Sequence, residues 1–142
     1  INNSLFGTRT RSLTLFEKFV RARLLLNPKL LRLVDMDLTW FEAAYLGQYP
    51  GLENIEDLDL RKNKLGDEGL EALLSSEKLS KIKKLDLRNN QITRRGMEIL
   101  VGSGKMKDLQ VLDIRSNRIG KVWEKKIKSN KKFPKLSSVK IV

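Results

Sequence analysis

Three aspartates and three arginines recur at a fixed interval in this 142-residue chain. Each aspartate stands two residues before an arginine, and the pairs follow one another at a constant spacing. The pairs are Asp59 with Arg61, Asp86 with Arg88, and Asp113 with Arg115. Carboxylates and guanidinium groups can neutralise each other, and both can contact complementary charges on another molecule. Two interpretations therefore stay open: a self-neutralising ladder and a surface that binds a partner.

Aligned carboxylates could also indicate a metal site or an acid–base pair. The neighbouring arginines supply the opposite charge, and no motif in the sequence indicates a pocket. The chain has no histidine and no cysteine, which excludes disulfides, thiolate nucleophiles, Cys/His zinc sites and every Ser-His or Cys-His catalytic arrangement. We therefore expect a protein that is not an enzyme and that carries no cofactor and no metal.

Positive charge is concentrated in the second half of the chain. Residues 1–71 hold 10 Lys/Arg against 11 Asp/Glu, whereas residues 72–142 hold 19 against 6. Cations in this half could neutralise the phosphates of nucleic acid or lie on anionic lipid. The candidates are Arg118, Lys121, Lys125, Lys126, Lys128, Lys131 and Lys132. The simpler interpretation is a solvated helix face, because no nucleic-acid motif accompanies the run and aromatic residues make up only 6% of the chain.

A 27-residue repeat must position these side chains. Copies start at Ile55, Ile82 and Leu109, and a partial copy starts at Leu136. Apolar residues at the first, fourth and sixth places of a copy predict a short strand with one buried face. The apolar residues that follow recur with the 3.6-residue period of a helix. Such a unit cannot bury its apolar face alone, so the copies must stack on one another.

An earlier, degenerate copy is predicted to start at Leu31, with Val34 and Met36 as its next apolar residues and a spacing of 24. Leu33, Met36 and Leu38 give an alternative register. In the first register Asp35 would precede the aspartate column, and Lys140 would follow it at the other end.

An asparagine follows the predicted strand in every full copy, at Asn63, Asn90 and Asn117. Its side-chain amide can bond to backbone groups of neighbouring copies, so we expect a structural asparagine ladder where the chain turns away from the sheet.

This pattern resembles the leucine-rich-repeat family over about residues 31–142, and its unit length and helical glycines resemble the ribonuclease-inhibitor-like subtype. The resemblance implies an α/β solenoid with a short parallel sheet on its concave side and helices on its convex side. In the third full copy Trp123 stands where Gly69 and Gly96 stood, which predicts a shifted or re-angled last helix. Inhibition of ribonucleases does not carry over, because ribonuclease inhibitor is rich in cysteine and has more coils.

The residues before the repeat are predicted to form a cap. Ser12 can begin a helix that places Leu13, Phe16, Phe19, Val20 and Leu24 on one face and ends at Asn27 and Pro28. The predicted domains are thus an N-terminal arm and capping helix, residues 1–30, and a repeat domain, residues 31–142, with strands starting near 31, 55, 82, 109 and 136. The chain stops in the last strand, which predicts an exposed edge unless something covers it: either the chain has been trimmed there, or the edge is a site of association.

These features predict a protein–protein interaction module that binds through the concave face of its sheet. The partner-binding candidates are Asp59, Arg61, Lys62, Lys84, Asp86, Arg88, Asp113 and Arg115. An acidic protein would fit them; nucleic acid or anionic lipid on the basic C-terminal half is the second hypothesis, and a purely structural piece of a longer repeat protein is the third. No apolar run approaches the roughly 18 residues of a membrane span. Absent cysteine slightly favours an intracellular, reducing compartment, but it fits an exported bacterial protein too, so the compartment stays open.

Overall fold

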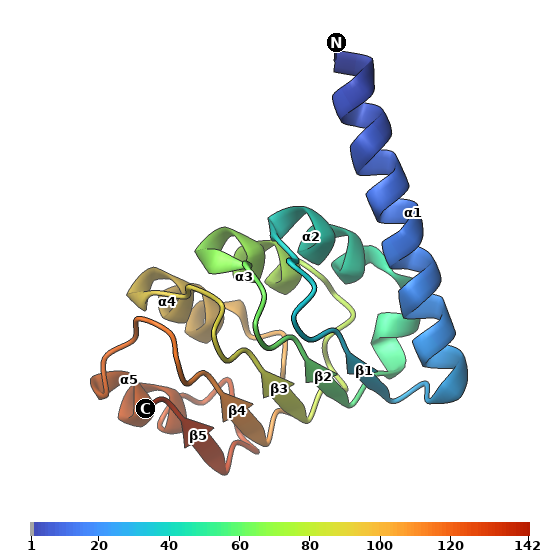
Figure 1. Cartoon of the computed structure of the whole chain (residues 1–142). Coiled ribbons are helices and arrows are strands. Elements are labelled where there is room, and N and C mark those ends of the chain that lie inside the picture. The colour runs from blue at the N-terminus through green and yellow to red at the C-terminus, as the bar shows by residue number, and fades with distance from the viewer. Residues whose placement is uncertain (1) are drawn as a thin grey trace.

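The computed structural model describes residues 2–142, with side chains from residue 13 onward. Short strands alternate with helices along the whole chain after a long first helix (Figure 1). The elements are α1 Asn2–Leu26, β1 Leu30–Arg32, α2 Trp40–Gln48, the 3-10 helix η1 Pro50–Asn54, β2 Asp57–Asp59, α3 Gly66–Leu74, β3 Lys84–Asp86, α4 Arg94–Ser103, β4 Val111–Asp113, α5 Val122–Lys128 and β5 Ser138–Lys140.

The strands form one parallel sheet in chain order, β1 to β5. Leucines at the centre of the first four strands are register partners of one another, and Val139 completes the row in β5. Helices α2 to α5 lie on the other side of the molecule from the strands (Figure 1). This arrangement confirms the predicted α/β solenoid with its parallel sheet and convex helices.

The register of the first repeat differs from the predicted one. Leu31 pairs with Leu58 in the sheet, so it occupies the fourth place of its repeat and not the first. The repeat therefore begins at position 28, and its spacing to the next copy equals that of the later copies instead of being shorter. Arg32, and not Asp35, is the neighbour of Asp59. We number the stacked units accordingly as coil 1 (28–54), coil 2 (55–81), coil 3 (82–108), coil 4 (109–135) and the partial coil 5 (136–142).

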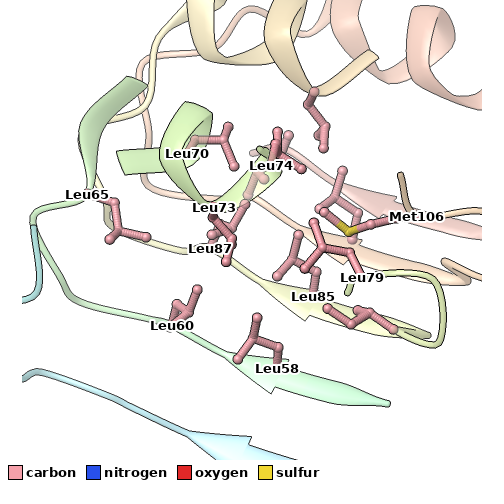
Figure 2. Close-up of a cluster of buried hydrophobic side chains, with 14 of the residues drawn as sticks. Leu58, Leu60, Leu65, Leu70, Leu73, Leu74, Leu79, Leu85, Leu87 and Met106 are labelled. Atoms are coloured by element: carbon pink, nitrogen blue, oxygen red, sulfur yellow. The ribbon is translucent and has the colours of Figure 1, made fainter. Parts of the chain in front are cut away.

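The core lies between the sheet and the helices (Figure 2). Leu58 lies in β2 and Leu60 directly follows it. Both point inward, because alternate residues of a strand face opposite sides, and both are almost completely buried. Leu70 and Leu73 of α3 are fully buried against them, as their spacing of three places them on one helix face. Buried apolar residues of strand and helix in the other coils, such as Leu85 with Leu100 and Leu112 with Ile127, make the core continuous along the stack.

The asparagines hold the turns that follow the strands. Asn90 is completely buried, and its Nδ2 donates to the backbone oxygen of Leu60 in the preceding coil at 2.8 Å. Its Oδ1 accepts from the backbone N–H of Leu65 at 3.3 Å. Asn63 and Asn117 make the corresponding bonds to the coils that precede theirs. Each coil is thereby linked to the previous one by side chain as well as by strand pairing.

Side-chain caps hold the N-termini of α2 and α4, and one of them links α4 to α3. Thr39 caps α2 in a capping box with Glu42. Thr93 caps α4, and its hydroxyl donates to Asp67 Oδ2 of α3 at 2.5 Å. Helix α5 is only seven residues long and, like α3, has no side-chain cap. Trp123 and Ile127 are its buried residues.

Helix α1 contacts β1 at the first edge of the sheet (Figure 1). Phe16 and Val20 are buried against the first coil, and Leu13, Phe19 and Leu24 pack partly against it. The helix starts at Asn2 and not at Ser12, whose side chain lies outside the described residues. Within the described residues, no helix combines the length and the apolar character that crossing a membrane would need.

Candidate functional site

The aspartates and arginines form a continuous staircase of ion pairs on the outward face of the sheet. Arg61 Nε lies 3.0 Å from Asp59 Oδ1 in its own coil and 3.7 Å from Asp86 Oδ2 in the next. Arg88 bridges two aspartates in the same way one coil on. Its Nη2 lies 2.7 Å from Asp86 Oδ2, and its Nε lies 3.4 Å from Asp113 Oδ2. The geometry is thus that of a self-neutralising ladder, and the guanidinium groups form its outer layer.

The aspartates are buried under this layer. Asp59, Asp86 and Asp113 are only 6–7% exposed, whereas the arginine side chains keep about a third of their surface in solvent. Burial alone would raise the pKa of Asp113, but the hydrogen bonds from Arg115 and the charges of Arg115 and Arg88 outweigh it and hold this pKa below its usual value. The hydrogen bond to Asp86 raises the pKa of Arg88. The carboxylates therefore serve to fix the arginines, and a partner would meet the arginines first.

Two cations end the aspartate column. Arg32 of β1 pairs in register with Asp59, and Lys140 of β5 pairs in register with Asp113. Both side chains are exposed, and neither forms an ion pair within the described residues. Sequence reasoning found Lys140 but missed Arg32, because the first coil was placed in the wrong register.

Lys62 and Lys84 also lie exposed on this side of the molecule. Lys84 is the first residue of β3, and Lys62 follows β2 with a left-handed backbone, φ 56°. Asp35, Asn89 and Ser116, each at the matching place of its coil, share this conformation. In the described part of the chain neither lysine has an acidic partner. The outward sheet face therefore carries four cations that are free to contact another molecule: Arg32, Lys62, Lys84 and Lys140.

The basic C-terminal residues do not gather on one helix face. Arg118 and Lys121 precede α5, Lys125, Lys126 and Lys128 lie on it, and Lys131 and Lys132 follow it. All seven are exposed. Lys128 pairs with Glu124, and Lys126 Nζ lies 4.5 Å from the centre of the Trp123 ring.

No group of three or more acidic side chains in the described residues is placed to hold a metal ion. The aspartate column is instead spaced by the strands and separated by arginines.

Comparisons with known proteins agree with this architecture. A family model described as Leucine Rich repeat matches residues 51–74, 78–101 and 105–122. A solved structure described as "Leiomodin-1 Actin-Binding Site 2 (ABS2)" superimposes with a TM-score of 0.63 at 17% identity, covering 80% of this chain and 70% of that chain. The search of curated proteins found no match. Three successive matches along the stacked coils, together with the fold, show that this chain belongs to the leucine-rich-repeat family.

Proposed function

We propose that this chain is a non-enzymatic module that binds a protein partner through the concave, outward face of its sheet. The observation that carries the proposal is the arginine row Arg61, Arg88 and Arg115, held in place by buried aspartates. A guanidinium has five N–H donors in a fixed plane, and the aspartates use only some of them. The remaining donors and the free lysines beside them would suit an acidic protein surface.

Fixing the arginines in advance supports binding for a thermodynamic reason. Ordering a long side chain on association costs roughly 0.5–1.5 kcal/mol. Each arginine here is already ordered by at least one carboxylate at hydrogen-bond distance. Leucine-rich-repeat domains generally mediate protein–protein interaction, which agrees with this use of the face.

The lysines provide a cleaner test than the arginines. Reversing the charge of Arg88 would bring a third carboxylate beside Asp86 and Asp113, and the sheet itself would lose stability. Lys62 and Lys84 have no such structural task. We expect Lys62→Glu with Lys84→Glu to weaken partner binding at least about tenfold while the thermal unfolding midpoint stays unchanged, since each lost rim charge pair contributes roughly 1 kcal/mol.

The partner can be captured with a photo-reactive residue in place of Lys84, with the same residue in place of Lys125 on α5 as the matched control. Cross-linking at 84 and not at 125 supports the concave face. Equal affinity of the double variant and the unaltered protein would contradict it. Actin is a first partner to test, because the leiomodin-1 structure is described as an actin-binding site, although at 17% identity that likeness extends to the fold alone.

The constant unit length and the matching helical positions of Gly69 and Gly96 support assignment to the ribonuclease-inhibitor-like subtype. Both glycines are buried where a Cβ would lie within 3.0 Å of a neighbouring side chain.

A second candidate function is electrostatic binding of a polyanion by the basic C-terminal half. It is favoured by the exposed cations Arg118, Lys121 and Lys125, which have no acidic partner within the described residues. A salt titration against nucleic acid and anionic vesicles tests this candidate, because each phosphate contact steepens the fall of affinity with salt.

A further inference from the structure

The segments that return from each helix to the next strand have the same structure in successive coils. A backbone N–H bonds the carbonyl three residues earlier at Ile82 to Leu79, Leu109 to Met106 and Leu136 to Phe133, at 3.2–3.3 Å. Leu79, Met106 and Phe133 are the buried anchors of these return loops. Equal structure at equal spacing means that the residues around the anchors are stacked from coil to coil.

A lysine directly precedes each of the three anchors. Lys78, Lys105 and Lys132 therefore form a column along the edge of the solenoid, and further lysines flank it. The loops 75–83, 102–110 and 129–137 contain eight lysines against Glu77 and Asp108, a net charge of +6, which is half of the net charge of the whole chain. The loop of coil 1 differs: Gly51 precedes its anchor, and its charged residues are Glu53 and Glu56. The basic edge thus begins at coil 2.

Acidic neighbours neutralise only part of this edge. Lys83 pairs with Glu56, Lys105 with Glu77 and Lys135 with Asp108. Lys132 Nζ donates to the backbone oxygen of Gly102 at 3.0 Å, which fixes it across the loop of the preceding coil. In the described part of the chain five lysines of these loops have no acidic partner. We call them the return-loop strip: Lys78, Lys81, Lys107, Lys131 and Lys132.

The strip is positive and elongated, and its loops expose no large hydrophobic side chain. The large apolar residues of the three loops are buried or partly buried, so none is available to enter a lipid bilayer. Phe133 is buried as well, so the loops offer no aromatic platform on which an unpaired base could stack. What remains is a row of amines, and the contacts of amines with phosphates position a duplex without carrying sequence information.

We propose that the return-loop strip binds the phosphate backbone of duplex nucleic acid, independently of base sequence. Neighbouring strands lie about 4.8 Å apart and packed helices about 8–10 Å apart. Each return loop joins a helix to a strand, so three lysines, one from each of the three loops, together cover about 10–20 Å. Phosphates of one duplex strand advance about 3.4 Å along the axis, so the row spans about three to six of them. This function is separate from protein binding by the sheet, because it uses another surface.

The test is a salt titration of binding to a short mixed-sequence DNA duplex. Five phosphate contacts predict a slope of log affinity against log salt of about −4.5. Substituting Lys81→Gln, Lys107→Gln and Lys131→Gln, all exposed and unpaired, should reduce the magnitude of that slope by about 2.7. Circular dichroism with thermal unfolding checks that the variant is folded.

The matched control removes the same charge from the sheet face, by Lys62→Gln, Lys84→Gln and Lys140→Gln. It should change the slope by less than about 1, because these residues lie outside the strip. The proposal is overturned by absence of duplex binding, by equal loss in both triple variants, or by binding to phosphatidylserine-containing vesicles without binding to duplex. The reciprocal measurement, on a protein partner, should affect only the control triple, so failure of either proposal is seen separately.

Discussion

Asp113 shows how a single residue on this face is balanced between burial and pairing. Burial favours the neutral acid, whereas the hydrogen bonds from Arg115 and the positive charges of Arg115 and Arg88 favour the carboxylate. Pairing prevails, so the folded protein holds the pKa of Asp113 below the ordinary 3.8. The unfolded chain lacks these partners. The charged form of Asp113 therefore contributes to the free energy of unfolding above about pH 4, and this contribution is lost as the pH falls through the folded value.

We expect acid to destabilise the protein partly through this residue. Between pH 6 and pH 3 the free energy of unfolding should fall more steeply in the unaltered protein than in Asp113→Asn, which has no carboxylate to protonate. Arg115→Gln should flatten the curve as well, because it removes the hydrogen bonds that depress the pKa. Urea unfolding at a series of pH values measures both. Parallel curves for the three proteins would contradict the assigned role of the ion pair.

The pairing of these residues was predictable from spacing alone. Residues two apart in a strand share a face, and a constant repeat interval stacks them, so Asp86 had to lie between Arg61 and Arg88. The low exposure of the aspartates was not predictable. The sequence places them on the outward face, but it does not reveal how much of each carboxylate a neighbouring arginine side chain covers. The free lysines followed from the same spacing, but their lack of acidic partners became visible only from the contacts.

Two glycines in helix α4 differ sharply in their surroundings. A Cβ added to Gly96 would lie 2.4 Å from Asp67 Oδ1 and 2.6 Å from Ile92 Cγ2. Asp67 is not free to move aside, since it accepts hydrogen bonds from the backbone and side chain of Thr93. A Cβ added to Gly102, six residues later, would meet nothing within 4 Å. The first glycine allows α3 and α4 to approach, and the second only lowers the intrinsic helix propensity.

The two alanine variants should therefore have opposite effects. Gly96→Ala should lower the free energy of unfolding by about 1–3 kcal/mol, the usual range for an overpacked site. Gly102→Ala should raise it by up to about 1 kcal/mol, because alanine is the better helix former. Chemical unfolding of both variants measures the difference. If Gly96→Ala proved neutral, the close contact between the two helices would be wrong.

The element that sequence reasoning misplaced is the strand of coil 1. In coils 2 to 4 an asparagine marks the register, but in coil 1 Met36 stands at the place equivalent to Asn63. The surrounding residues offer several apolar frames, and pattern alone cannot choose among them. The structure chooses through Asn63, whose side chain bonds to the backbone of Met36 and Leu38 and so fixes the coil from its neighbour.

The two ends of the whole molecule are protected to different degrees. At the N-terminal end α1 lies across β1, and Leu31 and Leu33 are completely buried. At the other edge of the described sheet lies β5, where Val139 and Ile141 keep 6–7% of their surface exposed. Helix α5, next to this strand, is seven residues long, against nine in α3 and ten in α4. In a stack where each coil contacts only its neighbours, these differences give each coil its own local stability.

We therefore expect the solenoid to open from its β5 end. The backbone N–H of Ile114 bonds to Lys140 in the last strand, whereas that of Leu60 bonds to Asp86 inside the stack, at nearly equal distances of 2.8 and 2.9 Å. If the whole domain opened at once, the amide hydrogens of Ile114 and Leu60 would be equally protected from exchange. Opening from the end predicts that Ile114 exchanges its amide hydrogen at least about tenfold faster than Leu60, a difference of about 1.4 kcal/mol in opening free energy. Native-state hydrogen exchange followed by NMR measures the two sites in one experiment.

Leu33, which bonds to Asp59 beneath α1, is the internal control and should exchange as slowly as Leu60. Equal protection at all three sites would mean that the coils unfold as one cooperative unit and that the open edge does not weaken the stack.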